Sequence, residues 1–104
     1  MLKKMEITTI EPDFIKVVLA GNLYVEEATE LRENLLQQID RGVHSIHFEL
    51  NGLEYIDSSG LGVLIAIHKR CVQKGGAVKL KGLKGNIKEL FELTRLTKVF
   101  DIEY

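Results

Sequence analysis

The residues best suited to chemistry lie together in one stretch of the chain, Asp57-Ser58-Ser59-Gly60-Leu61-Gly62. The stretch follows a strand-like segment and precedes a helix-like one, so we expect it at a helix N-terminus. There the first backbone amides lack intrahelical acceptors and carry the positive end of the helix dipole. Asp and Ser side chains cap such amides. We expect Gly60 and Gly62 to leave the backbone of the first turn open to a docking molecule.

Two interpretations of this stretch stay open, and they are compatible. The first is an ordinary N-cap, with the glycines present for close packing. The second is a serine hydroxyl displayed at a position where the amides and the dipole favour a phosphoryl group. One serine could cap the helix while the other is modified.

Familiar enzyme motifs are missing around the two serines. Neither has glycine two residues away on both sides, as a nucleophile elbow requires. No Gly-x4-Gly-Lys-Ser/Thr string is present, and Ile65 occupies the third glycine position of a dinucleotide fingerprint that would start at Gly60. The histidines and Cys71 show no metal-ligand spacing. We therefore expect no cofactor, no metal and no catalytic residue, and an enzyme or nucleotide binder using Asp57 and Ser58 is the least favoured hypothesis.

Hydrophobic periodicity places this stretch within an alternation of strands and helices. Runs of β-branched residues predict strands at Ile7–Ile10, Phe14–Ala20, Ser45–Leu50, Ala77–Leu80 and Val99–Ile102, with Asn51-Gly52 ending the third. Apolar residues three or four apart predict helices at Glu26–Asp40, Leu61–Lys74 and around Ile87–Thr94. A turn at Pro12 joins the first two strands into a hairpin.

The predicted order is β-β-α-β-α-β-α, with a last short strand. Strands that alternate with helices after a hairpin indicate an α/β (α+β) fold with right-handed crossovers. We expect a small mixed sheet of about four or five strands packed against about three or four helices. No linker or repeat interrupts the sequence, which predicts a single domain over residues 1–104.

Composition excludes several classes of protein. The 104 residues include 14 basic and 15 acidic side chains, a formal net charge of −1, and 45% are hydrophobic. These values exclude a disordered chain, a collagen-like fibre and a generally basic protein that coats nucleic acid. No apolar run is long enough to span a bilayer, and the N-terminus lacks the apolar core of a signal peptide. With one cysteine, Cys71, a reducing cytoplasm is the expected location.

The string Asp57-Ser-Ser-Gly-Leu-Gly-Val-Leu64 resembles the STAS-domain family, and most closely its bacterial anti-sigma factor antagonists (anti-anti-sigma factors). The resemblance extends over nearly the whole chain. It includes Val18–Leu23, Ala28–Leu35, Leu53–Gly62, Lys74–Gly76, Leu90–Thr94, Leu96 and Phe100.

The resemblance implies a regulatory binding protein that is not an enzyme. In that family the serine directly after the aspartate is phosphorylated by an anti-sigma factor that is an ATP-dependent serine kinase. The unphosphorylated protein binds this kinase and frees a sigma factor; the phosphorylated protein releases it, and a PP2C-type phosphatase resets the cycle. Ser58 is then the expected phosphoacceptor, in a monomer or weak dimer. The expected partner-binding residues are Asp57, Ser58, Ser59, Gly60, Leu61, Gly62, Asn22 and Tyr24.

The chain departs from the family's pattern at two places. Family members usually carry Gly-Glu-Leu/Ile-Asp where this chain has Gly21-Asn22-Leu23-Tyr24, so both acidic positions are lost, and Arg95 stands where glycine is frequent. The loss of acidity motivates an alternative function. STAS domains also serve as constitutive interaction subunits, in transporter ATPase complexes or stressosome-like scaffolds, without a phosphorylation switch.

Overall fold

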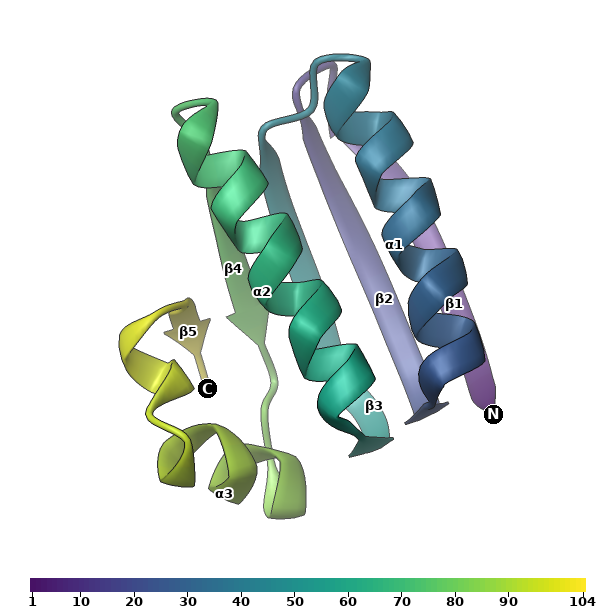
Figure 1. Cartoon of the computed structure of the whole chain (residues 1–104), viewed down its shortest axis with the longest axis vertical. Coiled ribbons are helices and arrows are strands. Elements are labelled where there is room, and N and C mark those ends of the chain that lie inside the picture. Colours follow the sequence, from purple (N-terminus) through teal and green to yellow (C-terminus); the bar gives the residue numbers. More distant parts are fainter.

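A computed structural model describes all residues, 1–104, and contains one five-stranded sheet with three α-helices. The strand order is β1-β2-β3-β4-β5; β1 is antiparallel to β2, and the other three pairings are parallel (Figure 1). The elements are β1 (Leu2–Glu11), β2 (Phe14–Leu23), α1 (Val25–Asp40), β3 (Ser45–Ile56), α2 (Ser58–Gln73), β4 (Ala77–Lys81), α3 (Gly85–Leu93), a 3-10 turn η1 (Leu96–Lys98) and β5 (Asp101–Glu103). This confirms the predicted fold class and element order.

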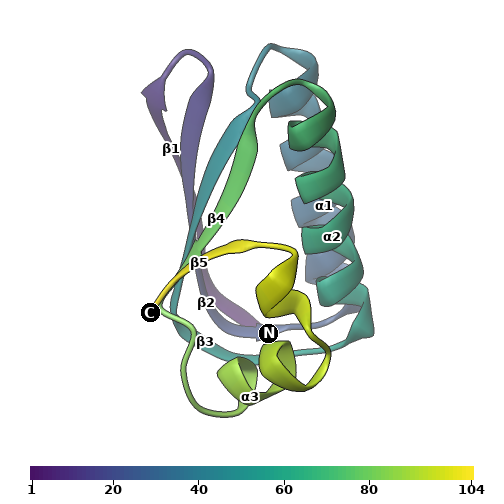
Figure 2. The same cartoon turned by 90° about the vertical axis from the view of Figure 1, so that its left-hand side faces the viewer.

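The helices cover one face of the sheet only. α1 and α2 lie side by side against that face, and no helix lies on the opposite one (Figure 2). Strand alternation explains the arrangement, because alternate residues point to opposite faces. Ile15, Val17 and Leu19 of β2 and Ile46 and Phe48 of β3 are fully buried under the helices. None of the helices has the length and apolar character that crossing a membrane requires.

α1 matches its sequence-based prediction closely. It begins at Val25, one residue before the predicted start, and ends at Asp40 as expected. The residues that it buries are the predicted apolar stripe of Ala28, Leu31, Leu35 and Ile39. Gly42 follows in a left-handed conformation with φ 111°, which is the conformation that glycine adopts readily after a helix.

The predicted end of the third strand at Asn51-Gly52 is wrong. β3 continues to Ile56, and the register with β2 shifts between the pairs Val18↔Glu49 and Ala20↔Gly52. Between these two pairs β3 advances by three residues while β2 advances by two. The extra residue makes a β-bulge, and the strand is not interrupted. A Cβ on Gly52 would lie 2.8 Å from the Cβ of Ala20, so glycine permits this close approach.

The second helix also begins earlier than predicted. α2 starts at Ser58 instead of Leu61, because Asp57 caps it and the two serines adopt helical conformations. Its two glycines differ in the space around them: Gly60 is closely packed and Gly62 is open. A Cβ on Gly60 would lie 2.6 Å from Cγ1 of Ile56 and 2.9 Å from Cδ2 of Leu23, whereas a Cβ on Gly62 would meet nothing within 4 Å. Gly60 thus lets the first turn of α2 pack directly on the ends of β2 and β3.

The C-terminal segment packs against α2 through aromatic rings. The His68 ring lies 5.0 Å from the ring of Phe100, which in turn lies 6.0 Å from that of Phe91. Nδ1 of His68 is inaccessible to solvent and has no hydrogen-bond partner. Burial lowers the pKa of His68 from its usual 6.5, because an imidazolium would lose hydration there.

Arg95 adopts a left-handed conformation with φ 61°, at the position where the resemblance predicts glycine. It separates α3 from η1 and is the one non-glycine residue of the chain with positive φ. Left-handed conformations are unfavourable for residues with a Cβ. Arg95 therefore stores a small amount of strain at this junction.

We predict opposite effects on stability from alanine at the two glycines of α2. Gly60→Ala should lower the free energy of unfolding by about 1 to 2 kcal/mol, because the methyl group must displace Ile56 or Leu23. Gly62→Ala should raise it by about 1 kcal/mol, because the site is open and alanine favours helix. Urea denaturation measures both. Equal effects of the two substitutions would contradict the packing described.

Replacing Arg95 by glycine should stabilise the protein by about 0.5 to 1 kcal/mol, since glycine takes positive φ without strain. Thermal denaturation provides the measurement. The matched control is Glu92→Gly inside α3, which should destabilise by about 1 kcal/mol. A destabilising Arg95→Gly would show that the Arg95 side chain contributes more than the strain costs.

Stability should fall as the pH drops below 6.5 in a way that depends on His68. The unfolded chain binds the proton more readily than the folded one, so stability is fully present above the unfolded pKa and is lost below it. His68→Phe keeps a ring against Phe100 and should flatten the decline of unfolding free energy as the pH falls below about 6.5. An unchanged pH profile in this variant would exclude His68 as the source.

Candidate functional site

The candidate site lies at the edge of the sheet where β2 and β3 end and α1 and α2 begin (Figure 1). Parallel strands bring their carboxyl ends to the same edge, and the register pairs Asn22 with Tyr55 and Leu23 with Ile56. The residues that follow, Tyr24 and Asp57, are the N-caps of the two helices. The sequence-predicted residues of both loops are therefore neighbours in space.

Asp57 is a complete N-cap. Its backbone is extended, with φ −101° and ψ −174°, and its Oδ1 accepts a hydrogen bond of 3.0 Å from the amide of Gly60. The first intrahelical hydrogen bond runs from the Leu61 amide to the Asp57 carbonyl, at 3.0 Å. The amides of Ser58 and Ser59 precede that bond, so α2 itself gives them no acceptor. The predicted N-cap is confirmed, with Asp57 as the capping residue; neither serine caps the helix, although the sequence allowed one of them to do so.

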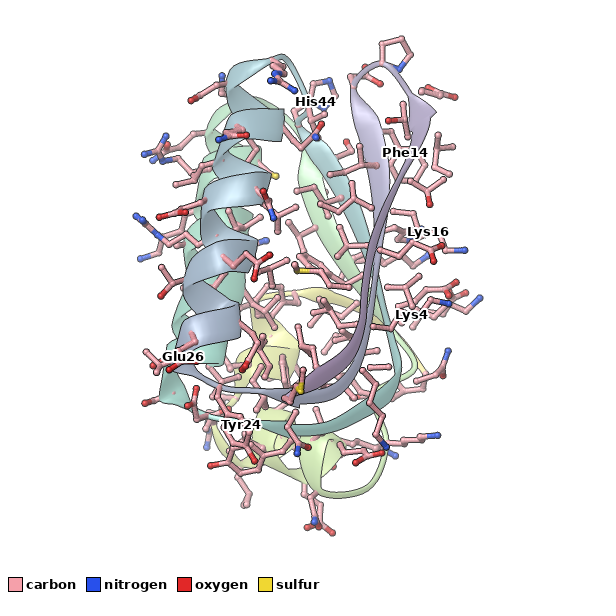
Figure 3. The ribbon with its side chains drawn as sticks, turned by 90° about the vertical axis from the view of Figure 1, so that its right-hand side faces the viewer. Lys4, Phe14, Lys16, Tyr24, Glu26 and His44 are labelled. Atoms are coloured by element: carbon pink, nitrogen blue, oxygen red, sulfur yellow. The ribbon has the colours of Figure 1, made fainter.

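Ser58 is the exposed hydroxyl of this helix start, and Ser59 is half-buried. No side-chain hydrogen bond in the structure involves either serine. α2 has no acidic residue in its first turn. No side-chain base is hydrogen-bonded to Ser58, and the labelled His44 lies at the opposite end of the sheet from Tyr24 (Figure 3). No side chain of this protein is hydrogen-bonded to Ser58 as an activating base, so transfer of a group to this hydroxyl would need a base from another protein.

The predicted contact residues at the start of α2 differ in their exposure. Gly60 is buried against Ile56 and Leu23, so the expectation that it leaves the backbone open is wrong; its role is to seat the helix. Gly62 is exposed and its surroundings are empty, as expected. Leu61 is half-buried and packs on the hydrophobic core. The accessible surface of the helix start is formed mainly by Ser58 and Gly62.

An aromatic pair forms the adjoining surface. The ring of Tyr24 lies 5.4 Å from the ring of Tyr55, tilted by 44°, and these residues are 42% and 46% exposed. The next residue, Val25, is 56% exposed. Asn22 is half-buried, and its backbone N–H donates a hydrogen bond to the backbone carbonyl of Met1. Sequence reasoning missed Tyr55 and Val25, because only the register between β2 and β3 places Tyr55 beside Tyr24.

No group of three or more His, Cys, Asp or Glu side chains is arranged to hold a metal ion. Cys71 is fully buried, and burial raises the pKa of its thiol to about 11. A thiol with this pKa is protonated and unreactive near neutral pH. The chemistry that the site can offer is thus a serine hydroxyl, a helix N-terminus and an exposed aromatic surface.

Comparison with known proteins places this geometry in a family. The chain matches the STAS domain over residues 5–104. The Anti-sigma-B factor antagonist of Bacillus subtilis (strain 168) is 35% identical over 88 residues, which are 85% of this chain and 80% of that protein. The same-named protein of Listeria monocytogenes is 30% identical over 100 residues, 95% of this chain and 87% of that protein.

The fold also matches solved structures of the Bacillus cell fate determinant SpoIIAA, an anti-sigma factor antagonist. The phosphorylated form superimposes with a TM-score of 0.81 at 17% identity, covering 97% of this chain and 92% of SpoIIAA. The unphosphorylated form gives 0.77 at 18% identity, covering 92% and 97%. At this identity the match concerns the fold alone. On the family match and the sequence identity to the curated relatives, the chain belongs to the STAS domain family.

Proposed function

We propose that this protein is an anti-sigma factor antagonist of the cytoplasm whose binding is switched by phosphorylation of Ser58. In this proposal the unphosphorylated protein binds an anti-sigma factor with serine-kinase activity, so that a sigma factor is released. Phosphorylation ends the complex, and a PP2C-type phosphatase restores the hydroxyl. The names and extensive coverage of the curated relatives support the antagonist role.

The observation that carries the switch is the position of Ser58. It is an exposed hydroxyl at the first position of α2, directly after a cap that is already formed by Asp57. Because Asp57 satisfies the Gly60 amide, Ser58 is not needed as the capping residue and can be modified without loss of the cap. The two interpretations of the sequence are therefore compatible: Asp57 provides the cap, and Ser58 is the hydroxyl that we propose is modified.

Phosphorylation would act through local charge. The γ-phosphoryl group of ATP passes to Oγ of Ser58, the hydroxyl proton leaves with the kinase's base, and ADP departs. The product carries about −1.5 to −2 additional charges, which takes the formal net charge from −1 to about −3. The free amides of Ser58 and Ser59 and the helix dipole would offset part of this charge. The modified helix start can therefore keep its conformation.

A partner surface that accepts a neutral hydroxyl would have to desolvate this dianion. Charged groups are costly to bury without a compensating partner. A penalty of about 3 kcal/mol at the interface would weaken binding more than about a hundredfold. Steric and electrostatic change at a single side chain is enough for the switch, without a rearrangement of the sheet.

A constitutive interaction subunit is the second candidate, favoured by the uncharged residues at the end of β2. Asn22 and Tyr24 present no carboxylate beside Ser58, and Tyr24 is packed on Tyr55. Such a subunit would bind its partner through the same aromatic surface and would never be phosphorylated. The state of Ser58 in cells separates the two candidates.

The test of the switch compares Ser58 with its neighbour. After incubation with ATP and a candidate kinase, mass spectrometry should locate one phosphoryl group on Ser58. Ser58→Ala should abolish incorporation, while the matched control Ser59→Ala should retain it. Ser58→Asp should weaken binding of the unmodified partner by at least about tenfold, measured by calorimetry, because it places a fixed charge at the helix start.

Two results would count against the proposal in different ways. Phosphate that persists in Ser58→Ala would show that the site is elsewhere. A Ser58 that stays unmodified in cells under all growth conditions, together with stable capture of a transporter ATPase, would favour the constitutive subunit.

A further inference from the structure

A groove of about 710 Å³ lies between the first half of β1 and the first turns of α1, next to the aromatic pair. Its apolar part is formed by Met1, Leu2, Met5, Tyr24 and Val25. β1 is the edge strand of the sheet, so the groove opens to solvent on its outer side. Figure 3 shows this side of the molecule, with Lys4 on β1 and Tyr24 and Glu26 at the start of α1.

Three carboxylates form the α1 side of the groove. Glu26, Glu27 and Glu30 line it, and none of them lies within 4.0 Å of a basic side chain. Oε1 of Glu27 is in addition inaccessible to solvent and has no hydrogen-bond partner. A carboxylate oxygen that is withdrawn from water without a donor is unfavourable. A cationic donor entering the groove would relieve this cost.

The two lysines on the β1 side do not neutralise these carboxylates. Nζ of Lys3 lies 2.9 Å from Oε1 of Glu54, and Nζ of Lys4 lies 3.6 Å from Oε2 of Glu6. Both positive charges are therefore directed to acids outside the groove lining. The three carboxylates of α1 therefore have no ion-pair partner, and they lie next to an apolar surface.

We infer that this groove binds a basic amphipathic segment of the partner protein, one that alternates Lys or Arg with apolar side chains. The inference rests on the proposed function, in which that partner is the anti-sigma factor. Charge complementarity selects the occupant, because an acidic segment would be repelled by Glu26, Glu27 and Glu30. The apolar side chains would contact Met5 and Val25, and a cation could also lie over the ring of Tyr24.

The groove is continuous with the surface around Ser58. Tyr24 lines the groove and at the same time packs on Tyr55, which belongs to the strand leading into Asp57 and Ser58. A partner bound over Ser58 can therefore extend along Tyr24 into the groove. The aromatic pair would form the centre of the interface and the carboxylates one of its ends, in agreement with the enrichment of Tyr at interface centres.

The test reverses or removes charge inside the groove and at one matched position outside it. Glu30→Lys should weaken binding of the unphosphorylated protein to its anti-sigma factor by about tenfold or more, and Glu27→Gln by about fivefold. The control Asp40→Lys changes the charge of the same helix at an exposed residue that does not line the groove and lies about 15 Å along the helix from Glu30. It should change the affinity by less than about twofold at physiological salt, where the Debye length is about 8 Å.

Salt dependence gives a second readout of the same contact. Calorimetry at about 50 mM and about 300 mM salt should show a smaller loss of affinity for Glu30→Lys than for the wild-type chain. Equal effects of Glu30→Lys and Asp40→Lys would mean that only the general charge of α1 matters, and would overturn the inference that the partner binds in the groove. Circular dichroism of each variant ensures that a loss of binding is not a loss of folding.

Failure of the groove and failure of the proposed function give different results. If Ser58→Asp abolishes binding but the groove variants bind like wild type, the inference that the partner binds in the groove is wrong. The proposed function then stands. If no anti-sigma factor binds, the proposed function fails. A 15N NMR titration then tests whether the groove binds a basic segment. It uses a synthetic Lys-Leu peptide of about 12 residues and a Glu-Leu peptide as the control.

Chemical-shift changes of the backbone amides of Val25, Glu27 and Glu30 that occur with the basic peptide and not with the acidic one would support binding in the groove. Their absence would overturn the inference. Sedimentation addresses the remaining occupant, a second copy of this chain. Self-association that Glu30→Lys abolishes would replace the partner segment by a dimer contact and would overturn the inference.

Discussion

The structure depends on one packing contact, the seat of the first turn of α2 on the ends of β2 and β3. Gly60 makes this contact, with Ile56 and Leu23 closer to it than any side chain would permit. On a helix, successive residues are about 100° apart, so residues two positions before and after Gly60 point away from the sheet. These residues are Ser58 and Gly62, which are both exposed. The glycine that fixes the helix thus determines that Ser58 faces outward.

This contact requires that β2 and β3 end at the same level. The paired segments Phe14–Leu23 and Ser45–Ile56 have 10 and 12 residues, so β3 must absorb two extra residues. It does so at two register shifts, the first of them at Gly52. Without them the cap of α2 would be displaced along the sheet from the cap of α1. The bulges therefore bring Tyr24, Tyr55 and Ser58 to one surface.

Sequence patterns predicted the parts of this arrangement that local physics determines. The stripe of α1 follows from helical periodicity, and the cap by Asp57 follows from its side chain, which can reach the Gly60 amide. The bulge at Gly52, the burial of Gly60 and the Tyr24–Tyr55 pair depend on strand register instead. Register is a relation between segments far apart in the chain, and neither segment's own pattern contains it. For the same reason the groove between β1 and α1 has no signature in the sequence.

The charges around Ser58 act on different steps of an encounter with a basic partner. The carboxylates of Glu26, Glu27 and Glu30 would attract the inferred basic partner over the Debye length, and a phosphoryl group on Ser58 would add to that attraction. In the docked complex the same phosphoryl group must lose its water against a surface shaped for a hydroxyl, and this cost acts at contact distance. Long-range attraction changes mainly the association rate, and desolvation at contact changes mainly the dissociation rate. In the proposed switch, phosphorylation would therefore end a stable complex even though it would make the surface more attractive to the partner at a distance.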